Sequence, residues 1–305
     1  MISVILPFFN RLEAVRRAIR SLQAQTFSGE WEVILVDDGS TSPRAELKAL
    51  SEQAKNAGMR FIKLPQNCGV AAARCAGVEE ARGDWFAFLD SDDEWLPPKL
   101  QTQLAWHDEH PDIRVSQVSE MWLRDGRTIK KPRHLEQRAG NLFAEAVERC
   151  VISPSCVMLS RDLWIETGGF DARFRVCEDY AWWLQVTAKE EIGLIPGAPL
   201  VRKHDGAAPQ LSRAIPVLDR WRVVALLERI IEPTFSAHQR ATMKGAAIEK
   251  ARRIHTGAEK RGHRELAQLF ANVAQVLDSD ASINRSLLAA VWASCDLSSD
   301  SELTA

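Results

Sequence analysis

The sequence has no run of about 18 apolar residues, the length that a membrane-spanning helix needs. It also has no basic region followed by an apolar stretch of signal length, because it enters a strand-like ISVIL at once. These absences predict a cytoplasmic protein, and a location at the inner face of a membrane stays open.

An excess of positive charge is lacking too. Lys and Arg number 39 against 41 Asp and Glu, a net charge of -2, so the sequence does not predict a nucleic acid partner. A hydrophobic content of 46% over 305 residues is enough for a sizeable core and excludes a disordered chain.

The six cysteines form no CxxC pair and have no histidine at metal-ligand spacing, which argues against a zinc site and against a disulfide framework. We expect reduced thiols, most of them buried. Tyr180 is the only tyrosine, beside ten tryptophans. This aromatic mix suits core packing and sugar stacking equally well.

Two periodicities alternate through the first 90 residues. Apolar runs of strand length are separated by segments with helical spacing; the runs are 2–6, 31–36, 60–64 and 85–89. A repeat of strand, helix and strand every 25 to 30 residues or so predicts right-handed crossovers and a parallel sheet. This layout is typical of α/β nucleotide-binding proteins.

The pattern then changes twice. Pro97-Pro98 opens a helix, and the runs 115–123 and 127–130 flank Asp125-Gly126, a hairpin signal. From Ile215 onward the spacing is helical, over 217–231, 237–261, 264–277 and 287–292. We therefore predict a first domain over 1–214, with halves 1–95 and 96–214, and a C-terminal helical region over 215–305.

The segment Asp90-Ser91-Asp92-Asp93-Glu94 places four acids directly after the strand-like run 85–89. Ligands of open α/β folds bind at the carboxyl edge of the sheet. Clustered carboxylates repel one another, and Mg²⁺ or Mn²⁺ would hold them together. The alternative is a solvated, capped helix start before Pro97.

Two further segments are expected at the same edge. Asp37-Asp38-Gly39-Ser40 ends the second strand, and the alternative for it is an Asp-Gly turn that only leads into the next helix. Asn67-Cys68-Gly69 begins the third helix, whose N-terminus attracts anions, and Arg74 lies one turn in.

Five segments in order resemble the inverting family 2 glycosyltransferases: SVILPFFN, VILVDDGST, NCGVAAAR, FLDSDDEW and GGFDARFRVCEDYAWWLQ. They span 3–185, about two thirds of the chain. The resemblance implies an A-type (GT-A), Rossmann-like fold, α/β with a mostly parallel sheet flanked by helices and followed here by the C-terminal helical appendage.

The resemblance also implies roles for individual residues. The nucleotide-sugar would be bound by Pro7, Phe9, Asn10, Asp38, Arg74, Asp90, Ser91 and Asp92. A Mn²⁺ or Mg²⁺ ion would be held by Asp92 or Asp93, and His204 is a further metal-ligand candidate. His204 lies in a polar segment, 202–206 with 210–212, that resembles a donor-covering loop; simple solvation of this histidine is the alternative.

Asp179 would be the general base, since an acceptor hydroxyl is a poor nucleophile until a positioned carboxylate takes its proton. The alternative is an acid placed to favour a helix N-terminus. Glu178, Trp182 and Trp183 would bind the acceptor. One tryptophan is expected in the core and the other against a sugar, because adjacent helical positions face apart.

The function expected is transfer of a sugar from a nucleotide-diphospho-sugar, first of all a UDP-sugar, to a glycan or lipid-linked acceptor in a single displacement. Thymidine or guanosine donors stay open. A catalytically idle binding or scaffold protein of the same fold is one alternative. A sugar nucleotidyltransferase is a weaker one, because Pro7-Phe8-Phe9-Asn10 stands where such an enzyme carries a Gly-rich phosphate loop.

Charge is uneven in the last third. The segment 240–264 has eight basic and two acidic residues, whereas 276–305 has five acidic and one basic. Solvated helix faces explain this pattern. Alternatively, five basic residues face an anionic acceptor or membrane surface: Lys250, Arg252, Arg253, Lys260 and Arg261. Pairing of two chains is a third role open to these helices.

Overall fold

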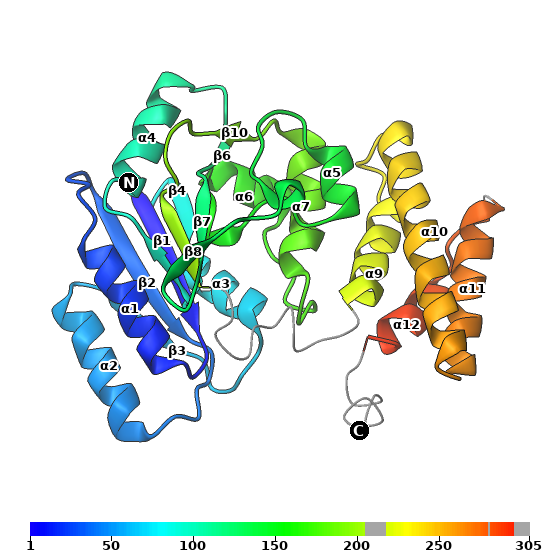
Figure 1. Cartoon of the computed structure of the whole chain (residues 1–305), viewed down its shortest axis with the longest axis horizontal. Coiled ribbons are helices and arrows are strands. Elements are labelled where there is room, and N and C mark those ends of the chain that lie inside the picture. The colour runs from blue at the N-terminus through cyan, green and yellow to red at the C-terminus, as the bar shows by residue number, and fades with distance from the viewer. Residues whose placement is uncertain (205–217, 280, 296–305) are drawn as a thin grey trace. The chain divides into compact units, whose positions relative to one another are not determined.

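The computed structural model describes residues 1–204, 218–279 and 281–295 (Figure 1), and the chain divides into two compact units. The first comprises Met1–Leu142 and Val151–Gln210, and the second comprises Phe143–Cys150 and Leu211–Ala305. The second unit thus includes a short segment that the sequence analysis assigned to the first domain. The predicted boundary at 214/215 and most of the polar segment, 205–206 and 210–212, lie outside the described residues.

The first unit alternates strands and helices. Its strands are β1 (Ile2–Phe8), β2 (Trp31–Asp37), β3 (Arg60–Lys63), β4 (Trp85–Phe88), β5 (Asp93–Trp95), β6 (Val115–Gln117), β7 (Glu120–Arg124), β8 (Arg127–Ile129), β9 (Val157–Ser160), β10 (Gly193–Leu194) and β11 (Val201–His204). Its helices are α1 (Leu12–Gln23), α2 (Arg44–Asn56), α3 (Val70–Glu79), α4 (Lys99–Glu109), α6 (Arg161–Thr167) and α7 (Glu178–Lys189), with 3-10 turns η1 (Arg133–Leu135) and η2 (Pro154–Cys156).

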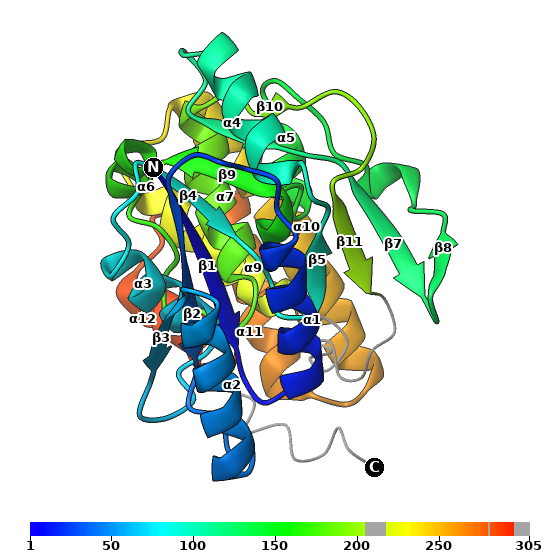
Figure 2. The same ribbon diagram turned by 90° about the vertical axis from the view of Figure 1, so that its left-hand side faces the viewer.

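In the described part of the chain, the main sheet has seven strands in the order β10-β6-β9-β4-β1-β2-β3. The strands β4, β1, β2 and β3 are mutually parallel, as the spacing of the apolar runs predicts, and β9 runs antiparallel between β4 and β6. Helices α1 and α2 cover one face of the sheet and α3 covers the other (Figures 1 and 2). The prediction of a GT-A type sheet flanked by helices is confirmed.

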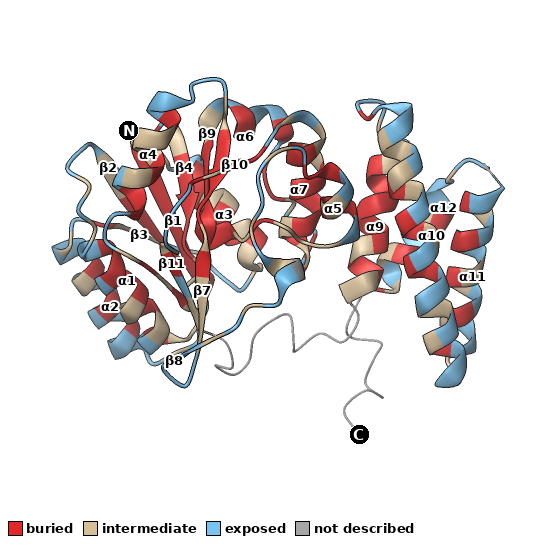
Figure 3. Cartoon of the chain, turned by 45° about the horizontal axis from the view of Figure 1, so that its top comes forward, coloured by how far each residue is buried: buried red, intermediate tan, exposed pale blue. Residues whose placement is uncertain are grey.

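Burial on both faces explains the continuous apolar runs, because each parallel strand is covered on two sides. All seven residues of β1 are buried, and the sheet interior is the most buried part of this unit (Figure 3). Val4 and Leu6 belong to the core that includes α1 and α2. On the other face, Gly77 lets α3 approach closely, since a Cβ there would lie 2.5 Å from Ile5.

The predicted hairpin forms, but its first arm is shorter than expected. The run 115–123 contains two strands in two sheets: β6 joins the main sheet, and β7 begins at Glu120. The smaller sheet has the order β5-β11-β7-β8 within the described residues (Figure 2). The turn between β7 and β8 has positive φ at both Asp125 (51°) and Gly126 (74°), the geometry that two-residue hairpin turns prefer.

The second unit is helical, as predicted. It contains α5 (Phe143–Glu148), α9 (Leu218–Ile231), α10 (Ala237–Lys260), α11 (Arg264–Asp278) and α12 (Arg285–Ala293). Ser236 and Gln239 form a capping box that starts α10. Apolar side chains such as Leu226, Phe270 and Val291 are fully buried and form the core of this unit.

The basic face expected on α10 is smaller than predicted. Lys250 is 1% exposed, and its Nζ donates to the Glu148 carbonyl at 3.0 Å, so its assignment to an anion-facing surface is wrong. Arg252 forms an ion pair with Asp278. Lys260 and Arg261 are exposed, as expected.

The six cysteines are thiols outside any disulfide, as expected, but only Cys156 and Cys295 are buried and the other four are partly exposed. Among the described residues, no helix has both the length and the apolar character to cross a membrane.

Candidate functional site

The carboxyl ends of β1, β2 and β4 lie at one edge of the main sheet, because the three strands are parallel neighbours. The register pairs Phe8 with Asp37, and the amide of Asp38 donates to the Phe8 carbonyl at 2.8 Å. Asp90 follows β4 at the same edge. The acids of the two strand-end segments therefore lie at the same edge of the sheet, as the sequence predicts, on strands that flank β1.

Asn10 joins the loop after β1 to the loop after β2. It has a left-handed φ of 57°, and its Oδ1 accepts from the amides of Thr41 (3.0 Å) and Ser42 (3.1 Å). Its own amide donates to Ser40 Oγ at 2.7 Å. Beside it, Phe9 is 39% exposed, as expected for a residue that stacks on a base, whereas Pro7 is buried within β1.

Asp38 organises the start of α3. Its Oδ1 accepts from the Cys68 amide at 2.8 Å, and its Oδ2 accepts from the Gly69 amide at 2.9 Å and from Asn67 Nδ2 at 3.0 Å. Burial raises the pKa of this carboxyl, and the two backbone donors oppose the rise without cancelling it. The segments DDGS and NCG are thus held together by one side chain.

Arg74 joins the DSDD turn to the Glu178-Asp179 pair. Its guanidinium is 3% exposed and donates to Asp90 Oδ1 at 2.6 Å and to Glu178 Oε1 at 2.7 Å, and it stacks 4.8 Å from the centroid of the Phe170 ring. Arg74 is thus engaged in two ion pairs, and its position near the base or phosphates of a donor stays a prediction. The DSDD turn lies beside the first turn of α7, where Asp179 follows Glu178.

The two carboxylates on Arg74 differ in acidity. Burial would raise the pKa of Asp90, but the charges of Arg74 and Lys203 outweigh it, so that pKa is lowered. Burial and the neighbouring Asp179 raise the pKa of Glu178 to about 7 despite Arg74. Glu178 is 7% exposed, so its predicted contact with an acceptor is wrong for this arrangement.

Asp92 lies at the more exposed side of the DSDD turn, next to the partly exposed Ser91. Its side chain is 20% exposed and Oδ2 accepts from Arg11 at 2.9 Å, while Arg17 donates to its carbonyl at 3.1 Å. Arg17 Nε also lies 3.3 Å from Glu94. Two arginines, Arg17 of α1 and Arg11 directly before that helix, thus neutralise this side of the turn.

Asp93 is buried and points away from solvent. It is 2% exposed, its Oδ2 accepts from Ser155 Oγ at 2.6 Å, and Lys203 Nζ lies 3.7 Å away. Burial raises its pKa to about 8. The prediction that Asp93 is an alternative metal ligand is wrong, because its carboxylate is buried and bound by Ser155.

The predicted base and its neighbours occupy the first turns of α7. Asp179 is partly exposed, and its Oδ1 accepts from the Tyr180 amide at 2.7 Å. Trp182 and Trp183 are 1% and 0% exposed and stack on each other with ring centroids 4.5 Å apart. The prediction that one of them stacks on a sugar is wrong, because both rings belong to the core.

A profile of the family described as "Glycosyl transferase family 2" matches residues 3–167, more than half of the chain. The chain belongs to glycosyltransferase family 2. The resemblance that the five motifs indicate is therefore confirmed.

Relatives of this family 2 chain support the same assignment. An uncharacterized glycosyltransferase of Rickettsia conorii is 33% identical over 63% of this chain, and the chain spans only 31% of that relative's length. The putative teichuronic acid biosynthesis glycosyltransferase TuaG of Bacillus subtilis is 29% identical, over 62% of this chain and 73% of TuaG.

Solved structures share the fold. S. aureus TarS residues 1–349, in complex with UDP-GlcNAc, superposes with a TM-score of 0.64 at 17% identity and covers 92% of both chains. The mannosyltransferase PcManGT of Pyrobaculum calidifontis, in complex with GDP-Man and Mn²⁺, gives a TM-score of 0.56 at 14% identity over 95% of this chain and 85% of that one. At these identities the likeness establishes the GT-A fold alone.

One acid of this family 2 chain, Asp92, fits the ligand set of a divalent cation. Within the described residues, no three His, Cys, Asp or Glu side chains are grouped so as to hold a metal ion. Mg²⁺ usually takes one or two carboxylates and completes its shell with water and substrate phosphates, a role that the partly exposed Asp92 suits. His204 Nε2 lies 2.5 Å from Glu94 Oε1, so its role as a ligand stays a prediction.

Sequence reasoning missed the cations that balance this site. Arg11, Arg17 and Lys203 contact the acids after β4, and Ser155 binds Asp93. Arg11 precedes an amphipathic helix next to the PFFN segment and Arg17 lies within that helix, which is a weak signal. Lys203 was noted only as part of a polar segment. Ser155 carries no signal, since its partner is 62 positions away.

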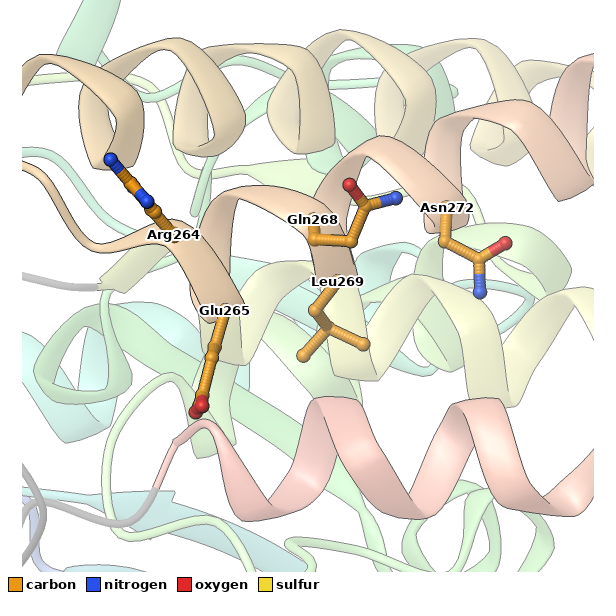
Figure 4. Close-up of a pocket in the computed structure, with 5 residues that line it drawn as sticks. All are labelled: Arg264, Glu265, Gln268, Leu269 and Asn272. Atoms are coloured by element: carbon orange, nitrogen blue, oxygen red, sulfur yellow. The ribbon is translucent and has the colours of Figure 1, made fainter.

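The second unit has a surface depression of its own. Residues of α11 line it: Arg264, Glu265, Gln268, Leu269 and Asn272 (Figure 4). These five side chains come from a single helix and include one carboxylate, so the depression has no constellation for catalysis.

Proposed function

We propose that this chain is an inverting glycosyltransferase that transfers a sugar from a nucleotide-diphospho-sugar, with a UDP-sugar as the first candidate, to an acceptor hydroxyl. One observation carries the proposal. Arg74 pairs with Asp90 and with Glu178, and so places the DSDD turn next to Asp179 within one unit. The halves 1–95 and 96–214 would bind the nucleotide and the acceptor, respectively.

Asp179 would take the proton of the acceptor hydroxyl as it attacks the anomeric carbon. Its partly exposed position at the start of α7 suits this role, because a base must reach the proton that it removes. Glu178 and Arg74 would act as positioning residues that hold α7 against the DSDD turn, residues 90–93, which is called the acid turn from here on. A single displacement of this kind inverts the anomeric centre and needs no covalent intermediate.

Asp92 would hold a Mn²⁺ or Mg²⁺ ion together with the donor's phosphates. The bound ion would supply Lewis-acid stabilisation of the charge on the departing nucleoside diphosphate. Phe9 would stack on the base, while Asp38 and Asn10 would keep the surrounding loops in place. Arg11 and Arg17 would add positive charge where the diphosphate leaves.

The relatives point to the class of acceptor. TuaG is named for teichuronic acid biosynthesis, and AmsE of Erwinia amylovora, 26% identical over 61% of this chain and 69% of AmsE, is named for amylovoran biosynthesis. Both names refer to polysaccharides. We therefore propose a glycan or lipid-linked glycan as acceptor.

The test measures release of UDP from UDP-glucose and UDP-GlcNAc, with and without Mn²⁺, by the wild type and by Asp179→Asn. A base contributes about 10²- to 10⁴-fold, so a loss of this size is expected. Asp162→Asn is the matched control, because Asp162 is also an acid in the first turn of a helix and is exposed.

An Asp179→Asn variant that keeps most of its turnover would overturn the base assignment. A wild type that binds UDP but releases none from any donor would favour the idle scaffold. The anomeric configuration of the product, read by proton NMR, decides between inversion and retention.

A further inference from the structure

Trp122 lies at the centre of the smaller sheet, close to the acid turn. The register pairs Lys203 of β11 with Trp122 of β7 on one side and with Asp93 of β5 on the other. Residues directly opposite one another on neighbouring strands share a face of the sheet. Trp122 therefore projects from the same face as Asp93, with one strand between them.

The neighbours of Trp122 fix the orientation of its ring. Its indole Nε1 donates to Glu120 Oε1 at 2.8 Å, and Lys131 Nζ lies 2.8 Å from the same carboxylate and 5.8 Å from the ring centroid. Glu120 is itself 8% exposed and lies near Lys203, which together with Lys131 lowers its pKa to about 2 although burial opposes this. The ring is thus held by a carboxylate that stays ionised at neutral pH.

Exposure separates Trp122 from the tryptophans of α7. Trp122 is partly exposed, whereas Trp182 and Trp183 are core residues. A pyranose ring has one face of C–H groups that packs on an aromatic ring and a rim of hydroxyls that needs polar partners. An oriented, partly exposed indole offers the apolar face and the partly exposed Lys131 beside it offers a polar partner, which is the usual composition of a small-ligand site.

We propose that Trp122 is the platform on which a pyranose ring of the saccharide acceptor stacks, next to the acid turn. This inference rests on the proposed function, since it assigns the acceptor side of that reaction. It places acceptor recognition on β7 of the smaller sheet instead of on α7.

The direct test is fluorine NMR of protein labelled with 5-fluorotryptophan. The Trp122 resonance is assigned by its loss in Trp122→Leu, and the control resonance by its loss in Trp31→Leu. Trp31 is also partly exposed, but it is the first residue of β2. It therefore lies at the amino edge of the main sheet, opposite the edge that carries the acid turn. Methyl β-D-glucopyranoside, methyl α-D-mannopyranoside and N,N′-diacetylchitobiose are added separately at millimolar concentration.

The Trp122 resonance is expected to shift with at least one of the three saccharides, while the Trp31 resonance stays unchanged. Failure of all three to shift it, in protein that still responds to UDP, would overturn the inference. This readout needs no turnover, so it remains decisive even if the wild type releases no UDP and the proposed function fails.

Kinetics give the second test in an active preparation. Trp122→Leu is expected to raise the KM for the saccharide that shifts Trp122 about tenfold and to leave hydrolysis of the donor by water unchanged. Trp122→Phe keeps an aromatic face and should recover most of the loss. Equal slowing of transfer and hydrolysis by Trp122→Leu would contradict an acceptor role and indicate a structural one.

Discussion

The two acidic turns at the sheet edge are held in different ways. The main partners of Asp38, after β2, are the neutral amides of Cys68 and Gly69, whereas Asp90, after β4, is bound by the cationic Arg74. Their pKa values move in opposite directions. Burial raises that of Asp38 in spite of its amide donors, and Arg74 with Lys203 lowers that of Asp90 in spite of burial.

The difference separates two tasks. Amide donors come from a neighbouring loop, so the turn after β2 is a local structure that fixes the start of α3. The cations on the turn after β4 come from α1, α3 and β11, so its geometry depends on elements far apart in the chain. Such a turn is sensitive to the loss of any one cation, because the buried charge left behind is costly.

The largest effect is expected for Arg74→Met. Removing the guanidinium leaves Asp90 and Glu178 without their shared partner, which should lower the free energy of unfolding by about 3–5 kcal/mol. Urea denaturation measures it. Arg114→Met is the matched control, since Arg114 also bridges two carboxylates, Glu166 and Glu190, but is 31% exposed. There the loss should stay near 1 kcal/mol or below. Equal losses of unfolding free energy in the two variants would contradict the claim that burial makes the ion pairs of Arg74 matter more than those of Arg114.

The turn after β2, which backbone amides hold, should be destabilised by an added side chain and not by the loss of a charge. Gly39 has φ of +68°, and a Cβ there would lie 2.2 Å from the backbone carbon of Gln66. Gly39→Ala therefore combines a left-handed alanine with a clash, and a loss of about 3 kcal/mol is expected. In Gly58→Ala, the φ of +74° is similar but no atom lies within 4 Å, so strain alone should cost about 1 kcal/mol. Thermal unfolding compares the two variants, and indistinguishable losses would rule out the clash.

Glu178 should make stability depend on pH. Its pKa of about 7 in the folded protein exceeds the 4.5 of the free side chain. Between these values the folded state keeps a proton that the unfolded state has lost, so stability falls as pH rises from 4.5 to 7 and then levels off. Relative to Glu178→Gln, the wild type should lose on the order of 3 kcal/mol across this range. Parallel pH profiles for the two proteins would contradict the raised pKa.

Among these substitutions, Asp92→Asn should change the stability least, and its main effect should be on binding of the cation. Its ion pair with Arg11 is partly exposed, so Asp92→Asn should change the unfolding free energy by less than about 1 kcal/mol. Binding of Mn²⁺ in the presence of UDP, followed by water-proton relaxation, should weaken about tenfold or more. Asp112→Asn, at an exposed loop acid, should leave both quantities unchanged. Unaltered Mn²⁺ affinity in Asp92→Asn would contradict its assignment.

Local pattern was enough to predict the strands β1 to β4, the helices between them, and the helices α9 to α12. β1 and β2 are continuous apolar runs because they are covered on both faces, and the acids that follow β2 and β4 lie at one edge of the sheet because parallel strands end together. The helices α9 to α12 follow from their spacing in the same way. These features depend on neighbours within one turn or one strand.

The contacts of the site depend on pairs that are distant in sequence, and there the sequence was a poor guide. The partners of Arg74 and the burial of Lys250 and Trp183 arise from packing between elements far apart in the chain. An apolar helix position predicts a core residue as readily as a sugar platform. Trp122, one of ten tryptophans in the sequence, stands out only once the strand register is known.

The separation of 104 positions between Arg74 and Glu178 also sets an order of events during synthesis. A ribosome adds about 5–20 residues per second, so roughly 5–20 s pass between the two residues. Until α7 is made and docked, Arg74 has Asp90 but lacks its other carboxylate. The acid turn and Asp179, the base that we propose, therefore reach their final arrangement together, and a nascent or prematurely ended chain holds no half-built form of the proposed catalytic centre.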